Sequence, residues 1–182
     1  MAIEVGTTSP FAPVSTGGGS AQSALVRPFP ITASEVISIG DVITIVAATG
    51  LVLDTNTAQG TNLVVGIAVQ PLTAPASVTD NDVLLIALAT PGTLFFGHLV
   101  GDATTDHATP AYADIDPTVP VDTIELTVQG YPAIDVSDTI VTSGVRIHQF
   151  AKEQLQGKPF KSGSGGTNNA RVTFSFVNSI FS

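Results

Sequence analysis

The residues that could do chemistry in this chain are its three histidines and its closely spaced aspartates. His98, His107 and His148 lie far apart in the sequence, and His98 and His148 fall within apolar segments that we expect to be strands. Nucleophilic catalysis by serine requires a base within hydrogen-bond reach, and it is often marked by a Gly-X-Ser-X-Gly motif, which does not occur here. The sequence therefore predicts structural or solvated histidines and no enzyme.

The closely spaced aspartates have three possible roles. A glycosidase needs two carboxylates facing each other across a sugar-binding cleft, normally lined with aromatic rings, but the chain has no Trp and only 2 Tyr. Asp also accepts backbone hydrogen bonds at turns, and this role is the main interpretation, with a bound Ca²⁺ in an oxygen-rich loop as the alternative. No spacing matches an EF-hand loop, so we predict no metal site and no cofactor. The pairs are Asp80 with Asp82, Asp102 with Asp106, Asp114 with Asp116, and Asp135 with Asp138.

The charge balance excludes some classes of partner. The chain has 15 acidic and 6 basic residues and a net charge of −9, whereas binding to a phosphate backbone needs arrays of Lys and Arg. No apolar run has the length of a membrane-spanning helix. We therefore expect neither nucleic acid nor a membrane as partner. Four basic residues lie close together in sequence and predict either a positive patch for an acidic partner or ordinary solvation: Arg146, Lys152, Lys158 and Lys161.

The remaining totals favour packing and contacts between subunits. The chain has 182 residues, which is enough for one β domain with its own core. It has no cysteine, so neither a disulfide framework nor a thiolate metal site is available. Hydrophobic residues reach 43% and charged residues only 12%, with a mean hydropathy of +0.39. This surplus of apolar residues predicts surface that other subunits cover.

Short apolar runs must position all of these residues. Turn formers such as Thr49-Gly50 and Pro91-Gly92 separate the runs, which is typical of antiparallel sheets. We predict an all-β fold: an antiparallel β-barrel-like or sandwich-like domain with an extended N-terminal arm and at most one short helix, at Phe150–Gln156. The predicted strands are Val42–Ala48, Leu51–Leu53, Leu63–Val69, Val83–Ala89, Thr93–Val100, Ile124–Val128, Thr139–Phe150 and Arg171–Phe181.

The composition also suggests boundaries along the chain. Residues 1–24 are rich in Gly, Ser and Thr and cannot offset their own ordering entropy, so we predict a flexible arm before a single β domain at 25–182. Residues 101–123 carry five aspartates and three prolines, which predicts a long acidic loop or insertion. Residues 1–20 lack the basic start and apolar core of a secretory signal, so we expect synthesis in a cytoplasm without processing.

Three stretches, taken with the extended N-terminal arm, resemble a known family. They are "IGDVITIVAATGLVLDTNTAQGTNLVVGIAV", the Pro-Gly hairpin "ATPGTLFFGHLVG", and the closing "GKPFKSGSGGTNNARVTFSF". Together they resemble the small head-decoration, or cement, proteins of tailed bacteriophages, over residues 30–100 and 140–178. The resemblance implies a compact β-barrel-like domain that sits as a homotrimer at three-fold or quasi-three-fold positions of an icosahedral capsid. Residues 101–123 have no counterpart in that pattern.

The resemblance also implies a location and a partner. The chain would be a structural protein of the virion that binds the outside of the shell and stabilises contacts between subunits of the major capsid protein. Its arm would lie on neighbouring capsid subunits, and an extended segment gains backbone hydrogen bonds when it adds to a sheet edge. Phe11, near Pro10 and Pro13, would be an apolar anchor. The predicted partner-binding residues are Ile3, Val5, Pro10, Phe11, Pro13, Arg27 and Phe29.

Two other functions remain open at this stage. The main alternative is a carbohydrate- or receptor-binding β module of a virion or cell surface, with residues 101–123 as the place for its site. A hydrolase is the third. The first of these would require exposed aromatic rings or an ordered Ca²⁺ loop.

Overall fold

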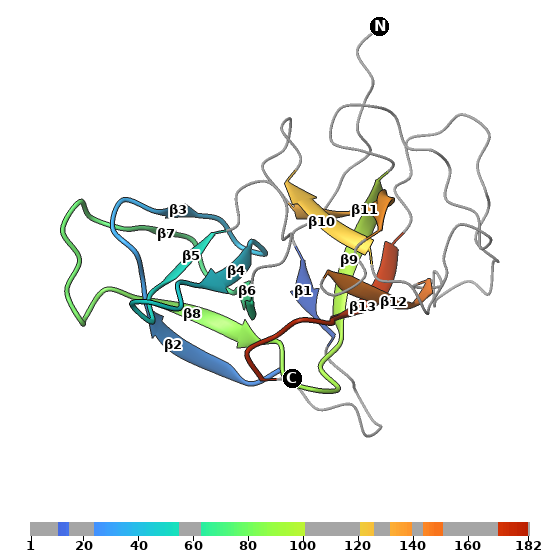
Figure 1. Cartoon of the computed structure of the whole chain (residues 1–182), viewed down its shortest axis with the longest axis horizontal. Helices are drawn as coiled ribbons and strands as arrows, with labels where there is room; N and C mark the ends of the chain where they lie inside the picture. The colour runs from blue at the N-terminus through green and yellow to red at the C-terminus, as the bar shows by residue number, and fades with distance from the viewer. Residues whose placement is uncertain are drawn as a thin grey trace, which may run out of the picture.

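The computed structural model describes residues 11–14, 24–54, 63–100, 121–125, 132–139, 144–150 and 171–181, and every structural statement concerns these ranges. Within them the chain forms strands and no helix, so the predicted all-β fold is confirmed (Figure 1). The strands are β1 (Ala12–Pro13), β2 (Val26–Pro30), β3 (Val36–Ile37), β4 (Val42–Ile45), β5 (Val52–Asp54), β6 (Val64–Ala68), β7 (Leu72–Thr73), β8 (Val83–Leu88), β9 (Phe95–Val100), β10 (Val121–Glu125), β11 (Pro132–Thr139), β12 (Val145–Phe150) and β13 (Arg171–Phe176).

An antiparallel sheet of five strands, in the order β2-β8-β6-β4-β5, occupies the left of Figure 1 together with the small β3-β7 pair. Strand β8 lies between β2 and β6, and its residues from Ile86 to Leu88 are all buried. This confirms the strand predicted at Val83–Ala89. The two edges of the sheet meet at one point, where Ile31 bridges Val52 and the Thr32 N–H donates to the Val52 carbonyl at 2.8 Å.

A β-bulge in β6 places Val64 and Ile67, which are three residues apart, on the same face of this sheet. Ile43 pairs with Gly66 and Thr44 pairs with Val64, so Val65 is one residue in excess on β6. A bulge interrupts the alternation of side chains along a strand. As a result, Val64 and Ile67 pack in the cluster shared with the second sheet, whereas Val65 packs in the cluster on the other face.

The second sheet has six strands in the order β1-β9-β11-β10-β12-β13 and lies to the right in Figure 1. Strand β9 also pairs with β13, which links β9, β11, β10, β12 and β13 into a closed circuit of pairings. Strands β9 and β11 run parallel, which corrects the prediction of purely antiparallel pairing. The physical reason is the intervening β10, because a long connection that includes another strand can return the chain in the same direction.

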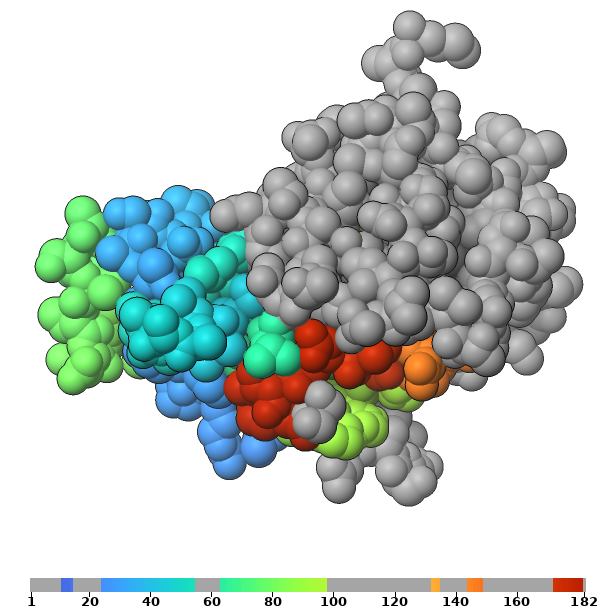
Figure 2. All heavy atoms as spheres, in the orientation of Figure 1, coloured from blue at the N-terminus to red at the C-terminus, as the bar shows by residue number. Residues whose placement is uncertain are grey.

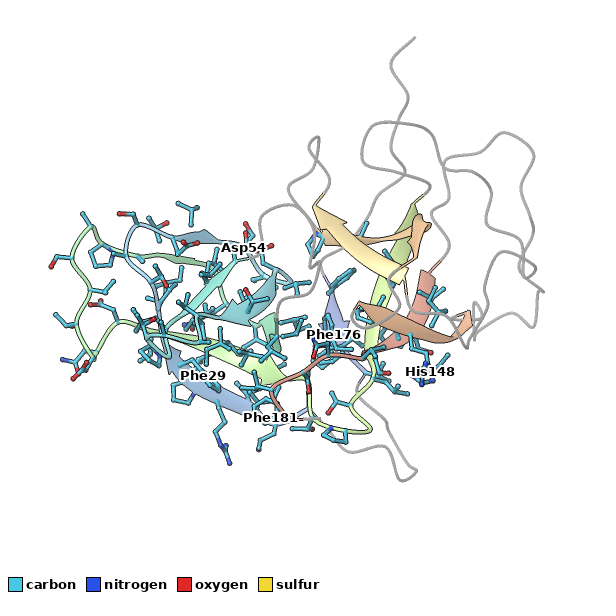
Figure 3. The ribbon with its side chains drawn as sticks, viewed as in Figure 1. Phe29, Asp54, His148, Phe176 and Phe181 are labelled. Carbon is cyan, nitrogen blue, oxygen red and sulfur yellow. The ribbon has the colours of Figure 1, made fainter. Side chains whose placement is uncertain are left out.

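One hydrophobic cluster joins the two sheets. Residues of the first sheet, such as Val64 and Ile67, contact a group from the second that includes Phe95 and Phe174. Four phenylalanine rings form contacting pairs with these distances between ring centroids: Phe11 and Phe174 at 4.9 Å, Phe95 and Phe174 at 5.8 Å, Phe95 and Phe176 at 5.4 Å, and Phe174 and Phe176 at 5.4 Å. Phe176 lies in the middle of the view in Figure 3, between the two sheets.

The segment after β13 connects the second sheet to the first through backbone hydrogen bonds. The Val64 N–H donates to the Asn178 carbonyl, and the Ile180 N–H donates to the Val64 carbonyl, both at 3.0 Å. Ser179 forms a parallel bridge with Val64. Ile180 and Phe181 then pack against the cluster on the far face of the five-stranded sheet. Figure 2 shows these C-terminal residues, in red, lying against the residues of β6 and β2.

Several predicted boundaries change in the structure. The sequence predicts an acidic loop that ends at residue 123. In the structure Val121–Glu125 is strand β10, and residues 101–120 lie outside the described ranges. Strand β11 was not predicted, because its two aspartates favoured a turn. Asp54, which follows the predicted strand Leu51–Leu53, ends β5 and is buried. Phe150 ends β12, and the rest of the predicted helix lies outside the described residues.

Candidate functional site

The predicted anchor, Phe11, lies in the core of its own chain. Its side chain is 1% exposed and stacks at 4.9 Å on Phe174 of β13. A Cβ atom at Gly97 of β9 would lie 2.7 Å from Phe11 Cε1 and 2.8 Å from Phe174 Cε1. The glycine therefore provides the space in which both rings fit. The sequence did not identify Gly97, because nothing in the pattern of β9 shows which ring crosses it.

Strand β1 adds to the edge of β9 beside this ring. Ala12 pairs with Phe96 and Pro13 with Phe95, and the Val14 N–H donates to the Leu94 carbonyl at 2.9 Å. Because hydrogen-bonded residues alternate along antiparallel strands, the missing N–H of Pro13 would point away from β9, and its absence costs no bond to β9. The proline is thus compatible with strand pairing here.

The position of Phe11 corrects part of the prediction for the arm. Residues 11–14 belong to the six-stranded sheet, so a partner cannot reach Phe11 while β1 is in place. Burying one Phe side chain stabilises a fold by about 1.5–3 kcal/mol. Ordering each backbone residue costs about 1–2 kcal/mol, or about 4–8 kcal/mol for residues 11–14, so burial of the Phe11 ring alone offsets only part of the cost. Ile3, Val5 and Pro10 lie outside the described residues.

Arg27 and Phe29 lie on β2, the edge strand of the five-stranded sheet. The Arg27 side chain is exposed and donates to the Val26 carbonyl at 3.1 Å, while Phe29 is partly buried and packs against the cluster around Ile31. Figure 3 shows Phe29 beneath this sheet. Their role in binding a partner stays a prediction.

The prolines of β2 change the chemistry of its free edge. The Leu88 N–H donates to the Leu25 carbonyl and the Ile31 N–H donates to the Asp82 carbonyl, so the odd-numbered residues face β8. By alternation, the N–H groups of residues 28 and 30 would point outward, and both residues are proline. Proline on an edge strand removes donors that another strand would use. A partner at this edge must therefore bind mainly through side chains.

A polar cluster lies on the six-stranded sheet, where β12 meets β13. His148 Nε2 is 2.8 Å from Ser175 Oγ, and Arg146 is the cross-strand partner of Ser175. Ile147 pairs with Phe174 and Gln149 with Thr173, which makes His148 the extra residue of a β-bulge. Bulges of this kind redirect a side chain. Figure 3 shows His148 on β12, at the opposite end of the view from β2.

His148 and Ser175, whose Nε2 and Oγ atoms lie 2.8 Å apart, are the residue types of two of the three groups in a catalytic triad. In the part of the chain that the structure describes, no carboxylate is placed to hold the other ring nitrogen of His148. No group of three His, Cys, Asp or Glu residues that could hold a metal ion occurs among the described residues either. The arrangement supports binding by the serine and arginine side chains, and it assigns no catalytic step.

The environment of His148 lowers the pKa of its imidazole below 6.5, first because burial removes water from the ring and second because the Arg146 charge repels a proton. We expect a midpoint below 6.5 in an NMR titration of the ring, and a higher midpoint in the Arg146→Gln variant. The unfolded state then binds the proton at higher pH than the folded state does, so this group's contribution to stability is lost as the pH falls below about 6.5. A midpoint above 6.5 would contradict the described surroundings.

Asp82 and Asp41 serve turns, as predicted for the aspartates in general, whereas the pair Asp135 and Asp138 lies on strand β11. The Asp82 carboxylate accepts from the Thr79 N–H at 2.7 Å and from the Thr79 hydroxyl at 2.9 Å. The Asp41 carboxylate accepts from the Ser38 N–H, and Gly40 beside it has a φ of 91°. The two other histidines give no further site, because the side chain of His98 and all of His107 lie outside what the structure describes.

Two searches complete the description of the molecule. Within the described ranges, no helix has the length and apolar character needed to cross a bilayer. Comparisons with protein-family models, with curated proteins and with solved structures gave no match to this chain. A function must therefore be argued from the pattern of the sequence and from the geometry.

Proposed function

We propose that this chain is a structural protein of a virus particle that binds the outside of an icosahedral capsid and stabilises contacts between major capsid subunits, as a homotrimer. The sequence resemblance to cement proteins of tailed bacteriophages supports this function. An all-β domain whose N-terminal segment adds a strand to a sheet edge fits the same mode of attachment.

The observation that carries the proposal is the distribution of exposed apolar side chains. Among the described residues, the large hydrophobic side chains that are exposed all belong to the stretch between residues 25 and 63, in and around the five-stranded sheet. They are Leu25 at 45%, Val26 at 39%, Val36 at 67%, Ile39 at 44% and Leu63 at 43%. Removing apolar surface from water is the main driving force of protein association. The lobe formed by the five-stranded sheet and the β3-β7 pair is therefore the part of the molecule that we assign to the capsid.

The N-terminal segment supports a second contact. The Phe11 ring offsets only part of the cost of ordering residues 11–14, so in this proposal the segment exchanges between its position on β9 and a capsid subunit. The prolines of β2 disfavour pairing of its free edge with another strand. A capsid subunit at this edge would therefore contact the side chains of Leu25 and Val26. Attachment would combine a specific apolar surface with a segment that adds to a sheet edge.

The proposal predicts that the full-length protein co-sediments with capsid shells assembled from the major capsid protein of the same virus. In a variant with both Leu25→Ser and Val36→Ser, we expect at least tenfold weaker binding, because each change removes apolar surface worth about 1 kcal/mol at an interface. The measurement is the bound fraction as a function of shell concentration, with circular dichroism to verify that the variant is folded.

Asp80→Asn is the matched control, because it changes an exposed residue in the turn before β8, on the same lobe, without removing an apolar side chain. We expect its binding to shells to remain close to that of the unchanged protein. If the unchanged protein stays in the supernatant, the capsid function is wrong. If it binds and the double variant binds equally well, the assigned surface is wrong. Saturable binding on a glycan array without binding to shells would favour the carbohydrate-binding alternative.

A further inference from the structure

A cleft opens beside the polar cluster, between the β12–β13 pair and the turn that connects β8 to β9. Its volume is about 220 Å³. Its polar lining comes from both sides: Thr90 from the turn, Arg146 from β12, and Ser175 and Ser179 from β13 and the segment after it. Phe176 and Ala89 contribute apolar wall. Hydroxyl groups and one cation thus converge on a small space.

Arg146 supplies a positive charge that no described carboxylate neutralises. Its side chain is exposed, and its charge acts on His148, two positions along the same strand. Arg146 is one of only 6 basic residues in a chain that has 15 acidic ones. A guanidinium group presents a planar set of N–H donors that matches the oxygens of a carboxylate or phosphate.

The hydroxyl groups of the cleft can act as donors. Ser175 lies opposite Arg146 in the β12–β13 register, and cross-strand neighbours have Cβ atoms about 5 Å apart. When His148 Nε2 carries a proton and donates to Ser175 Oγ, the Ser175 O–H is left to donate elsewhere. On the other wall, Thr90 Oγ1 lies 2.8 Å from Thr93 Oγ1, so Thr93 can donate to Thr90 and leave the Thr90 O–H for a ligand.

We propose that this cleft is a binding site for a small oxyanion, held by the guanidinium of Arg146 and by the hydroxyls of Ser175 and Thr90. The ligand class is a phosphate or carboxylate group, either free or carried by a partner molecule. The site lies on the six-stranded sheet and does not depend on the capsid function, because its residues are separate from the apolar surface around Leu25 and Val36.

The test is a titration of the full-length protein with inorganic phosphate, at constant ionic strength, followed by NMR. We expect saturable shifts in the resonances of Thr90, Ser175 and His148. In the Arg146→Gln variant we expect at least tenfold weaker affinity, and in Arg146→Lys an intermediate loss, since the ammonium keeps the charge but not the paired donors. Arg27→Gln is the matched control, an exposed arginine on the other sheet, and should bind as the unchanged protein does.

A parallel titration with acetate separates the two sources of the ligand. Tighter binding of phosphate than of acetate indicates a phosphate ligand, and the reverse order indicates a carboxylate, such as an acidic side chain of a partner. The proposal is overturned if no saturable shift occurs up to about 0.1 M, where screening of charges becomes general. It is also overturned if Arg146→Gln binds phosphate as well as Arg27→Gln does. Folding of each variant is verified by its backbone amide spectrum.

Discussion

Replacing Phe174 with alanine is expected to lower the free energy of unfolding by about 3–5 kcal/mol, the usual cost of removing a buried aromatic ring. The Phe174 side chain is fully buried and contacts the rings of Phe11, Phe95 and Phe176. Its loss would leave a cavity where β1, β9 and β13 meet, and it would remove the surface on which Phe11 packs. The measurement is denaturation by urea or guanidinium, followed by circular dichroism.

Phe29→Ala is the matched control for this prediction. It removes the same side chain from a partly buried position on the edge strand β2, where less surface is lost and water can fill the space. We expect a cost of about 1 kcal/mol, below that of a full burial. Equal costs for the two variants would show that the four rings do not form the centre of the core. A Phe174→Leu variant, which keeps most of the volume, should fall between them.

A second large effect is expected at Gly66 of β6. A Cβ atom at this position would lie 2.0 Å from the carbonyl oxygen of Ala87 and 2.9 Å from Ile86 Cγ2 on β8. Backbone cannot move aside as a flexible side chain can, so Gly66→Ala must separate β6 from β8. We expect a loss at or above the upper end of the about 1–3 kcal/mol that overpacking usually costs. Denaturation measures it, and faster amide exchange in β8 would locate it.

Gly50→Ala separates steric overlap from backbone conformation. Gly50 has a φ of +72°, and nothing lies within 4 Å of a Cβ built on it. An alanine there is strained only by its left-handed conformation, which costs about 1–2 kcal/mol. Exchange in β8 should stay unchanged. If Gly66→Ala proves as mild as Gly50→Ala, the close approach of β6 and β8 is not as described.

Residues with strong local signals were predicted well. The apolar runs predicted as strands at 83–89 and 171–181 contain β8 and β13. Turn dipeptides fixed the reversals, as at Gly92, whose φ is 84°. These predictions succeed because a strand's period of two residues and the freedom of glycine at positive φ are local properties of the chain.

The candidate sites were predicted less well. The sequence identified Phe11 as an anchor, but only the fold decides that its ring is 1% exposed against Gly97 and Phe174. It treated His148 as an isolated strand residue, since Ser175 lies 27 positions away along the chain. The bulge that redirects His148 depends on the register between β12 and β13, and this register is a property of the tertiary structure.

The sequence alone determined that this protein is made of short β-strands separated by glycine and proline turn formers, and that its net charge is −9. The tertiary structure decided which strands pair, the parallel β9–β11 contact, the burial of β1 and the convergence of Arg146 and Ser175 on one cleft. The reason is that strand conformation depends on neighbouring residues, whereas pairing depends on contacts between residues distant in sequence, which a local pattern does not specify.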